Sequence, residues 1–409
     1  MPEADKRPLM IRAFNRLTPI TGLDRPLDFD RILRKARKNT GLRNPGQDFN
    51  DEAVKHLIRS VNEEARLHPF GRLMAREKLI SQLENRLWAE HWFARYPEIL
   101  EQEILPIILV TGLQRTGTTR MQRLLSGQDG ARALLTWEAL YPAPLGKPEE
   151  KEKRQVRTRR NERAVRWISP TFHAIHPIHF DKPEEDILLL DLHFMSSSAE
   201  AIMHLPSYAD WLNGQDQAEA YAYERKLLLL LQWQKGGRYW VLKTPHHLEY
   251  MPEFAAIFPD TRVIWMHRPL DVCVPSFLSM LFHSRALFSD HVDMEQIMQH
   301  WIDKLGRMIR GGMSFRASGV LPVMDILYDH VMKDEPAVLE GIADIWQDIG
   351  PVELHESHRK NKPVYKSRHR YDLKEWGLSE MDLFGQFQEY YELMQGLEKE
   401  QNGKERKIQ

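Results

Sequence analysis

Hydrophobic and polar positions follow two different periods along this chain. Between residues 27 and 100, apolar residues recur at helical spacing, most clearly in 51–64 and 69–96. Asn50 or Asp51 is placed to cap the first of these helices. Since no strand pattern interrupts them, the sequence predicts a helical N-terminal region over residues 1–100, packed on the rest of the protein.

From residue 104 onward, short apolar runs alternate with helical patterns. The candidate strands are 107–111, 131–137, 239–242, 262–266 and 320–326, and the helical patterns are 118–127, 217–235, 248–258, 270–285 and 294–316. This order predicts an α/β fold over residues 101–396, with a P-loop-like, mainly parallel sheet of about five strands flanked by helices. The polar segment 397–409 is expected to be a disordered tail.

Composition restricts the class of protein. The formal net charge of −1 gives no overall attraction to nucleic acid or to an acidic membrane. A single cysteine, Cys273, excludes an internal disulfide. The N-terminus lacks a signal-peptide pattern, and no apolar stretch approaches the ~20 residues of a membrane span. These features lead us to expect a soluble, cytoplasmic protein with no nucleic-acid partner and no membrane span; its oligomeric state stays open.

The first strand runs into a glycine-bounded loop that opens a helix. Backbone N–H groups in this geometry converge on one point and form an anion site. Gly112 and Gly117 have P-loop spacing and Thr119 stands at the usual Ser/Thr position, but Thr118 replaces the lysine that an NTPase places on its phosphates. The nearest cation is Arg115, inside the loop. The loop therefore indicates an anionic donor other than a nucleoside triphosphate.

Two later strand ends carry further candidate chemistry. In a parallel sheet, ligands bind beyond the carboxyl ends of the strands. Arg268 follows the fourth strand, and Ser276 comes eight residues later, about two helical turns on, so both can hold one phosphate. The third strand ends at Lys243, followed closely by His246 and His247. A histidine can take a proton from a hydroxyl near neutral pH.

Together these segments resemble sulfotransferases that use 3′-phosphoadenosine-5′-phosphosulfate (PAPS), in particular a broad, largely bacterial branch. Residues 114–119 resemble the family's 5′-phosphosulfate loop, Arg268 with Ser276 its 3′-phosphate segment, and residues 243–248 its central catalytic segment. Pro269 directly follows the arginine, where many members carry an acidic residue or Asn.

The resemblance implies transfer of a sulfuryl group from PAPS, the co-substrate, to a hydroxyl or amine of a small-molecule or glycan acceptor. It implies catalytic roles for Arg115, Lys243 and His247. The residues implied to bind the donor are Arg115, Thr116, Gly117, Thr118, Thr119, Arg268 and Ser276. No metal is expected, because the sequence has no metal motif and arginine and lysine can neutralise the donor.

Several assignments stay open. His246 and Glu138 are rival bases. Glu138 follows the second strand, and it is alternatively expected to orient Lys243 or to hold the fold. The acids at 184–186 are interpreted as first-turn residues that complement a helix dipole.

The charged run 147–166 is interpreted as a solvated helix, or as a cover near the donor. The basic segment 359–370 has no assigned role. A P-loop phosphotransferase and a non-catalytic nucleotide sensor remain rival functions.

Overall fold

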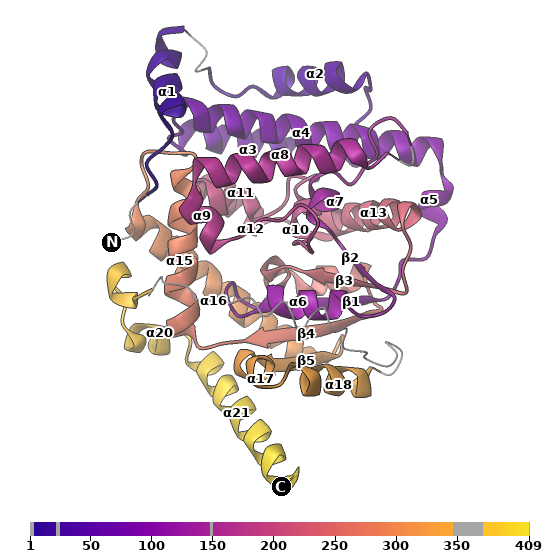
Figure 1. The fold of residues 1–409 in the computed structure, drawn as a ribbon, viewed down its shortest axis with the longest axis vertical. Coiled ribbons are helices and arrows are strands. Elements are labelled where there is room, and N and C mark those ends of the chain that lie inside the picture. Colours follow the sequence, from indigo (N-terminus) through magenta and orange to yellow (C-terminus); the bar gives the residue numbers. More distant parts are fainter. Residues whose placement is uncertain (1–3, 22–24, 148–149, 347–370, 409) are drawn as a thin grey trace.

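The computed structural model describes residues 4–21, 25–147, 150–346 and 371–408 (Figure 1). The N-terminal helices are α1 (Leu9–Thr21), α2 (Phe29–Thr40), α3 (Asp51–Glu63), α4 (Pro69–Arg95) and α5 (Glu98–Glu101). Asn50 caps α3 by accepting from the Ala53 N–H at 3.0 Å, as its position predicts. Leu83 and Leu87 of α4 belong to the same buried apolar cluster as Leu109 of the sheet, so these helices share the main core.

A five-stranded parallel sheet forms the centre of the described residues, in the order β2-β3-β1-β4-β5. The strands are β1 (Ile107–Thr111), β2 (Ala131–Ala133), β3 (Tyr239–Lys243), β4 (Thr261–His267) and β5 (Val323–Leu327). β1 is central: Ile107 lies opposite Trp240 on one side and Thr261 on the other. All of its residues are buried, which explains its uninterrupted apolar sequence. The predicted α/β sheet is confirmed.

Helices on both faces connect the strands (Figure 1). Between β1 and β3, in addition to β2, lie α6 (Thr118–Ser126), α7 (Thr136–Leu140), α8 (Glu152–Ile168), α9 (Pro170–Ile175), α10 (Ile187–Leu190), α11 (Ser198–Ile202), α12 (Pro206–Asn213) and α13 (Ala218–Gln234). After β3 come the 3₁₀ helix η1 (Pro245–Glu249) and α14 (Met251–Ile257), and after β4 come α15 (Leu270–Ala286) and α16 (Met294–Ser318). The described elements that follow β5 are α17 (Tyr328–Lys333), α18 (Glu335–Ile345), η3 (Leu373–Trp376), α20 (Glu380–Gln386) and α21 (Gln388–Ile408).

The second predicted strand is too long. β2 ends at Ala133, and α7 begins at Thr136, within the run predicted as strand. Glu138 lies in the first turn of α7, where its carboxylate accepts from the Leu135 N–H at 3.1 Å. Thr136, Trp137 and Glu138 therefore do not form a strand end, because this cap starts a helix there.

The segment 397–409, which was expected to be a disordered tail, lies mostly on α21, because this helix continues to Ile408. Tyr390, Met394 and Leu397 recur at helical spacing and are buried against the core, which anchors the helix. Within the described helices, none combines the length and the apolar character that crossing a bilayer requires.

The strand order fixes where a ligand is expected. From β1 the chain crosses to β2 and β3 on one side, and then to β4 and β5 on the other. The carboxyl end of β1 is therefore a topological switch point, at which the loops after β1, β3 and β4 diverge and leave room for a ligand. The candidate residues of the sequence, apart from Glu138 after β2, end or follow these three strands.

Candidate active site

The loop after β1 is held tight by two glycines with positive φ. Gly112 has φ 143°, and a Cβ there would lie 2.5 Å from the Met266 carbonyl oxygen. Gly117 has φ 94°, and a Cβ there would lie 2.4 Å from the Tyr328 ring. The buried Thr116 hydroxyl donates to the Leu113 carbonyl at 2.7 Å. The loop thus leads directly into the first turn of α6, and the N–H groups of a helix's first turn can bind an anion.

The residues predicted to hold the two ends of the donor meet in one cluster. Arg115, itself at φ 72°, donates from Nε to the Ser276 hydroxyl at 3.2 Å. Its Nη1 donates to the Ile175 carbonyl of α9 at 3.3 Å. Arg268 donates from Nη1 to the Arg115 carbonyl at 3.1 Å, and its guanidinium lies 4.2 Å above the Tyr328 ring. Segments about 150 residues apart therefore join at the switch point.

Ser276 lies two turns into α15 and is buried. Helical geometry returns it to the side of the helix start, so it faces the loop as its spacing from Arg268 predicts. Thr118 and Thr119 open α6, with Thr118 buried and Thr119 half-buried.

Lys243 ends β3 and is paired with Glu185, which the sequence assigned only to a helix dipole. Its Nζ lies 2.5 Å from Glu185 Oε1, and the Thr244 hydroxyl donates to Glu185 Oε2 at 3.3 Å. Lys243 is almost inaccessible, whereas the Glu185 side chain keeps 26% of its surface exposed. The Thr111 hydroxyl donates to the Thr244 carbonyl at 3.0 Å and ties the ends of β1 and β3 together.

Glu138, the predicted alternative partner of Lys243, is bound elsewhere. Arg132 Nη1 and Nη2 contact the two Glu138 oxygens at 2.9 and 2.8 Å, and both side chains are buried. The Arg132 guanidinium also stacks on the Trp240 ring at 4.6 Å. The bidentate pair occupies both carboxylate oxygens, so Glu138 stabilises the end of β2 in this structure.

His247 is completely buried, and protein groups occupy both ring nitrogens. Its Nε2 lies 2.9 Å from Asp186 Oδ2, and its Nδ1 lies 2.9 Å from the Tyr221 hydroxyl. His246 is also buried and hydrogen-bonded from Nδ1 to the Ser197 hydroxyl at 3.1 Å. Burial, and secondly the neighbouring His247, hold the pKa of His246 well below its usual value. Both histidines thus follow the strand end, as predicted, but are enclosed.

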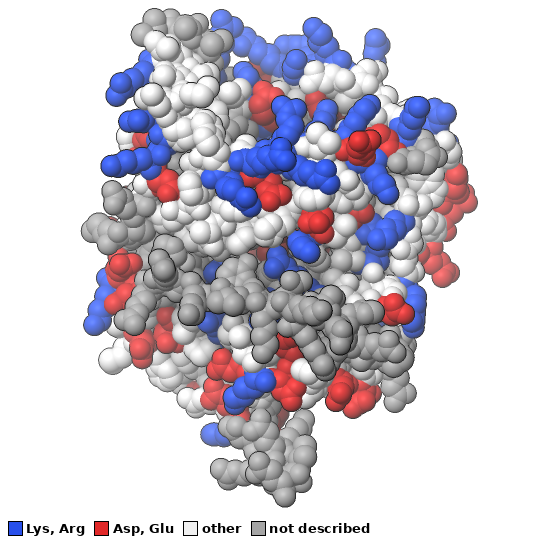
Figure 2. All heavy atoms as spheres, viewed as in Figure 1, with Lys and Arg blue, Asp and Glu red and all other residues white. Residues whose placement is uncertain are grey.

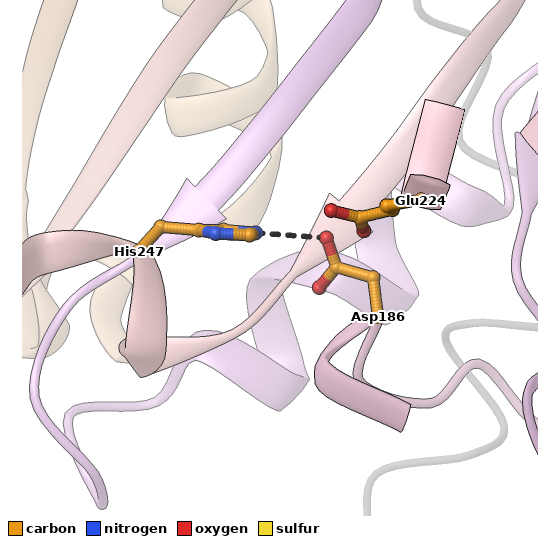
Figure 3. Close-up of side chains that lie close together, drawn as sticks. All are labelled: Asp186, Glu224 and His247. Carbon is orange, nitrogen blue, oxygen red and sulfur yellow. Dashed lines mark hydrogen bonds and ion pairs between the residues drawn. The ribbon is translucent and has the colours of Figure 1, made fainter. Parts of the chain in front are cut away.

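Glu224 of α13 completes a buried cluster with Asp186 and His247 (Figure 3). The ligand-type atoms of these three residues lie within 4.8 Å of one another, so the cluster could hold a metal ion. Burial, and then the charge of Asp186, raise the pKa of Glu224 well above its usual value. A protonated Glu224 beside a hydrogen-bonded Asp186–His247 pair reduces the buried negative charge without a metal.

The sequence interpreted residues 184–186 as first-turn acids, but two of them have specific partners. Glu185 pairs with Lys243, and Asp186 pairs with His247. The sequence did contain a sign of these two pairs. Glu185 and Asp186 are adjacent in one segment, and Lys243 and His247 are four residues apart in another. His176 was not singled out either: its half-buried ring is in electrostatic reach of Glu184, Glu185, Lys243 and Arg115, and burial lowers its pKa. The segment 359–370 lies outside the described residues.

The chain is similar to known proteins in sequence and in fold. Residues 106–347 match the model of a family described as the sulfotransferase family. The sulfotransferase STF1 from Mycobacterium tuberculosis H37Rv is 29% identical, with a TM-score of 0.73 over 89% of this chain and 99% of that one. The sulfotransferase STF9 from Mycobacterium avium has the same fold, at 24% identity and a TM-score of 0.78 over 89% and 96% of the two chains. A search among curated proteins gave no match.

Proposed function

Because this chain belongs to the sulfotransferase family, we propose that it transfers a sulfuryl group from PAPS to a hydroxyl or amine of a small-molecule acceptor. The reaction would release adenosine 3′,5′-bisphosphate. The observation that carries the proposal is the junction of Arg115, Arg268 and Ser276 beside the first turn of α6. Two guanidinium groups and a helix N-terminus at a switch point favour a ligand with several anionic groups.

The loop geometry fits the phosphosulfate end of the donor. Side chains at Gly112 and Gly117 would collide with Met266 and Tyr328, so the glycines let the backbone close around an anion. We assign the 5′-phosphosulfate to the N–H groups of residues 116–119 and to Arg115. We assign the 3′-phosphate to Arg268 and Ser276, because a guanidinium and a hydroxyl suit a phosphate monoester.

Lys243 is assigned to the charge that develops during transfer. The acceptor oxygen or nitrogen forms a bond to sulfur, the bond from sulfur to the bridging oxygen breaks, and that oxygen becomes part of a phosphate. An ammonium group at the end of β3 can stabilise the growing negative charge there, together with Arg115. Lys243 is held in a fixed position by Glu185, which reduces the reorganisation needed when the reaction begins.

The proton of the acceptor needs a base, and two groups are candidates. His247 is the residue implied by the sequence resemblance, but both its nitrogens are bonded inside the protein. Glu185 is partly exposed, and although its oxygens accept from Lys243 and Thr244, each carboxylate oxygen has a second lone pair that can take the proton of the acceptor. The exposure of Glu185 supports it as the direct base, with His247 acting only if its contacts to Asp186 and Tyr221 open.

The decisive experiment compares the binding of adenosine 3′,5′-bisphosphate with that of adenosine 5′-monophosphate by calorimetry. A second phosphate clamped by Arg268 and Ser276 should tighten binding about 10- to 100-fold, the range of one or two charge-assisted hydrogen bonds. Arg268→Ala should remove most of that difference. Equal affinities for the two nucleotides, together with magnesium-dependent ATP turnover, would instead support a phosphotransferase.

A further inference from the structure

The charged run that the nucleotide chemistry does not use forms the outward face of α8. Val156, Arg160, Arg163 and Trp167 are spaced by four, three and four residues, so they lie along one side of the helix. All four are exposed, with Trp167 at 52% and Val156 at 45%. The opposite side is buried at Arg154, Thr158 and Ile168. The face exposed to solvent therefore combines arginines with a tryptophan.

Helix α2 presents a similar face. Ile32, Leu33 and Ala36 are buried against α4, whereas the exposed bases occupy the other side. These bases are Arg31, Arg34, Lys35 and Lys38. Helix α1 adds apolar groups: Leu9, Met10 and Leu17 are 60–75% exposed and lie among the exposed Arg12 and Arg16.

Helices α1 and α2 pack on α4, and an ion pair joins α8 to α4. Glu84 of α4 accepts from Asn39 of α2 at 2.5 Å and lies 3.7 Å from Arg157 of α8. Asp5, just before α1, accepts from the N–H and the hydroxyl of Thr171 in α9, the helix that follows α8. Figure 1 shows α1, α2 and α8 arranged along α4. Figure 2 shows Lys and Arg side chains spread over the same part of the molecule.

The basic residues are concentrated in these segments, although the net charge of the whole chain is close to zero. Residues 1–43 contain 11 Lys and Arg against 5 Asp and Glu, and residues 147–168 contain 9 against 4. Since the whole chain has a net charge of −1, the remaining residues together carry a net charge of −12. A molecule with one basic side is attracted and oriented by a negatively charged surface even when its total charge is close to zero.

We propose that the outward surface of α1, α2 and α8 docks on an anionic lipid bilayer. Each basic side chain near such a bilayer contributes attraction, and exposed Trp, Leu and Met side chains enter the interface between head groups and acyl chains. A soluble polyanion would use the bases but would not need the apolar side chains. Docking would also bring the candidate active site close to the lipid, because α9 follows α8 and its Ile175 carbonyl accepts from Arg115.

Flotation of the full chain with vesicles tests the proposal. The protein should float with vesicles of phosphatidylcholine mixed with phosphatidylglycerol and remain unbound with phosphatidylcholine alone. Arg160→Glu with Arg163→Glu should weaken binding by about tenfold or more. Lys333→Glu with Lys374→Glu makes the same change of charge at exposed sites on α17 and η3, and should bind like the parent.

A second pair of variants separates a bilayer from other polyanions. Leu17→Ser with Trp167→Ser should also weaken vesicle binding, whereas Met381→Ser, at an exposed apolar position of α20, should not. An unchanged melting temperature and unchanged binding of adenosine 3′,5′-bisphosphate would show that each variant is folded. Equal binding to uncharged vesicles would overturn the proposal. The proposal would also be overturned if the apolar variants bound vesicles as well as the parent and heparin displaced the vesicles completely. The surface would then be a site for polyanions in general.

Discussion

Arg115 Nε donates a hydrogen bond to Ser276 Oγ across 3.2 Å and thereby links the loop after β1 to the helix after β4. The two residues are assigned to opposite ends of the donor, yet they are in direct contact. Arg268 donates to the Arg115 carbonyl and so adds a second hydrogen bond between this loop and the segment after β4. A substitution at Arg268 or Ser276 should therefore also alter how Arg115 binds the sulfuryl end of the donor.

Ser276→Ala should weaken the binding of adenosine 3′,5′-bisphosphate by about tenfold, the typical effect of losing one hydrogen bond to a charged group. Binding of adenosine 5′-monophosphate should change less, because that ligand lacks the 3′-phosphate. Calorimetric titration of both nucleotides gives the comparison. Ser279→Ala, at a buried position one turn further along α15, is the control and should leave both affinities unchanged.

Gly117→Ala should abolish nucleotide binding. The new Cβ would lie 2.4 Å from the Tyr328 ring, and that ring supports the Arg268 guanidinium at 4.2 Å. The tyrosine has to move, and Arg268 loses its support. Gly319→Ala is the matched control, since Gly319 also has a positive φ, 67°, but has no atom within 4 Å of its added Cβ. It should cost about 1 kcal/mol of stability, because alanine is strained at a positive φ, and leave binding intact. Tight binding by Gly117→Ala would show that the loop adapts.

Glu138→Ala should destabilise the protein by about 3 kcal/mol, because it leaves Arg132 buried without its carboxylate. Urea unfolding measures this loss, and Glu52→Ala, which removes an exposed partner of Lys55, should cost less than about 1 kcal/mol. The folded fraction of Glu138→Ala should keep its turnover of PAPS. A loss of turnover by several orders of magnitude without a loss of stability would make Glu138 catalytic after all.

The fold could be predicted largely from the sequence because the central strand and its neighbours are buried on both faces. Such strands read as continuous apolar runs, and β1 matches its predicted bounds. β2 was predicted too long because Leu134, Leu135 and Trp137 prolong the apolar run across the start of α7. Apolar content alone does not show where a strand ends and a helix begins.

The site could be predicted only in part. Arg115, Lys243 and Arg268 follow strand ends, and the strand-end rule brings such residues together whatever path the connections take. Glu185 and Asp186 lie outside such positions, on the long connection between β2 and β3, and local periodicity does not determine where that connection crosses the sheet. For the same reason, the sequence did not show that Asp186 and Tyr221 enclose His247.

Glu185→Gln and His247→Ala distinguish the two candidate bases. If Glu185 takes the proton, Glu185→Gln should lower turnover by roughly 10²–10⁴-fold, while the affinity for adenosine 3′,5′-bisphosphate persists. The release of that nucleotide from PAPS in the presence of a phenolic acceptor measures turnover. His247→Ala should also lower turnover if His247 is the base. The stability of each variant has to be measured beside its rate, because His247→Ala empties a buried site and Glu185→Gln does not.

Glu224→Gln should make the protein more stable at neutral and alkaline pH. Burial and the charge of Asp186 raise the pKa of Glu224 in the folded state above its unfolded value near 4.5. The folded protein therefore binds the extra proton, and its stability relative to the unfolded chain falls as the pH rises from about 4.5 toward the raised pKa. Glutamine keeps the shape of the protonated acid and has no proton to lose. Urea unfolding of both proteins between pH 5 and pH 9 should show a difference in the free energy of unfolding that widens with pH. A difference that stays constant would mean that Glu224 is not held protonated.

The same titration repeated with added Zn²⁺ tests the cluster as a metal site. A zinc-dependent gain of stability that Glu224→Gln abolishes would mean that a metal ion, and not a proton, balances the buried charge.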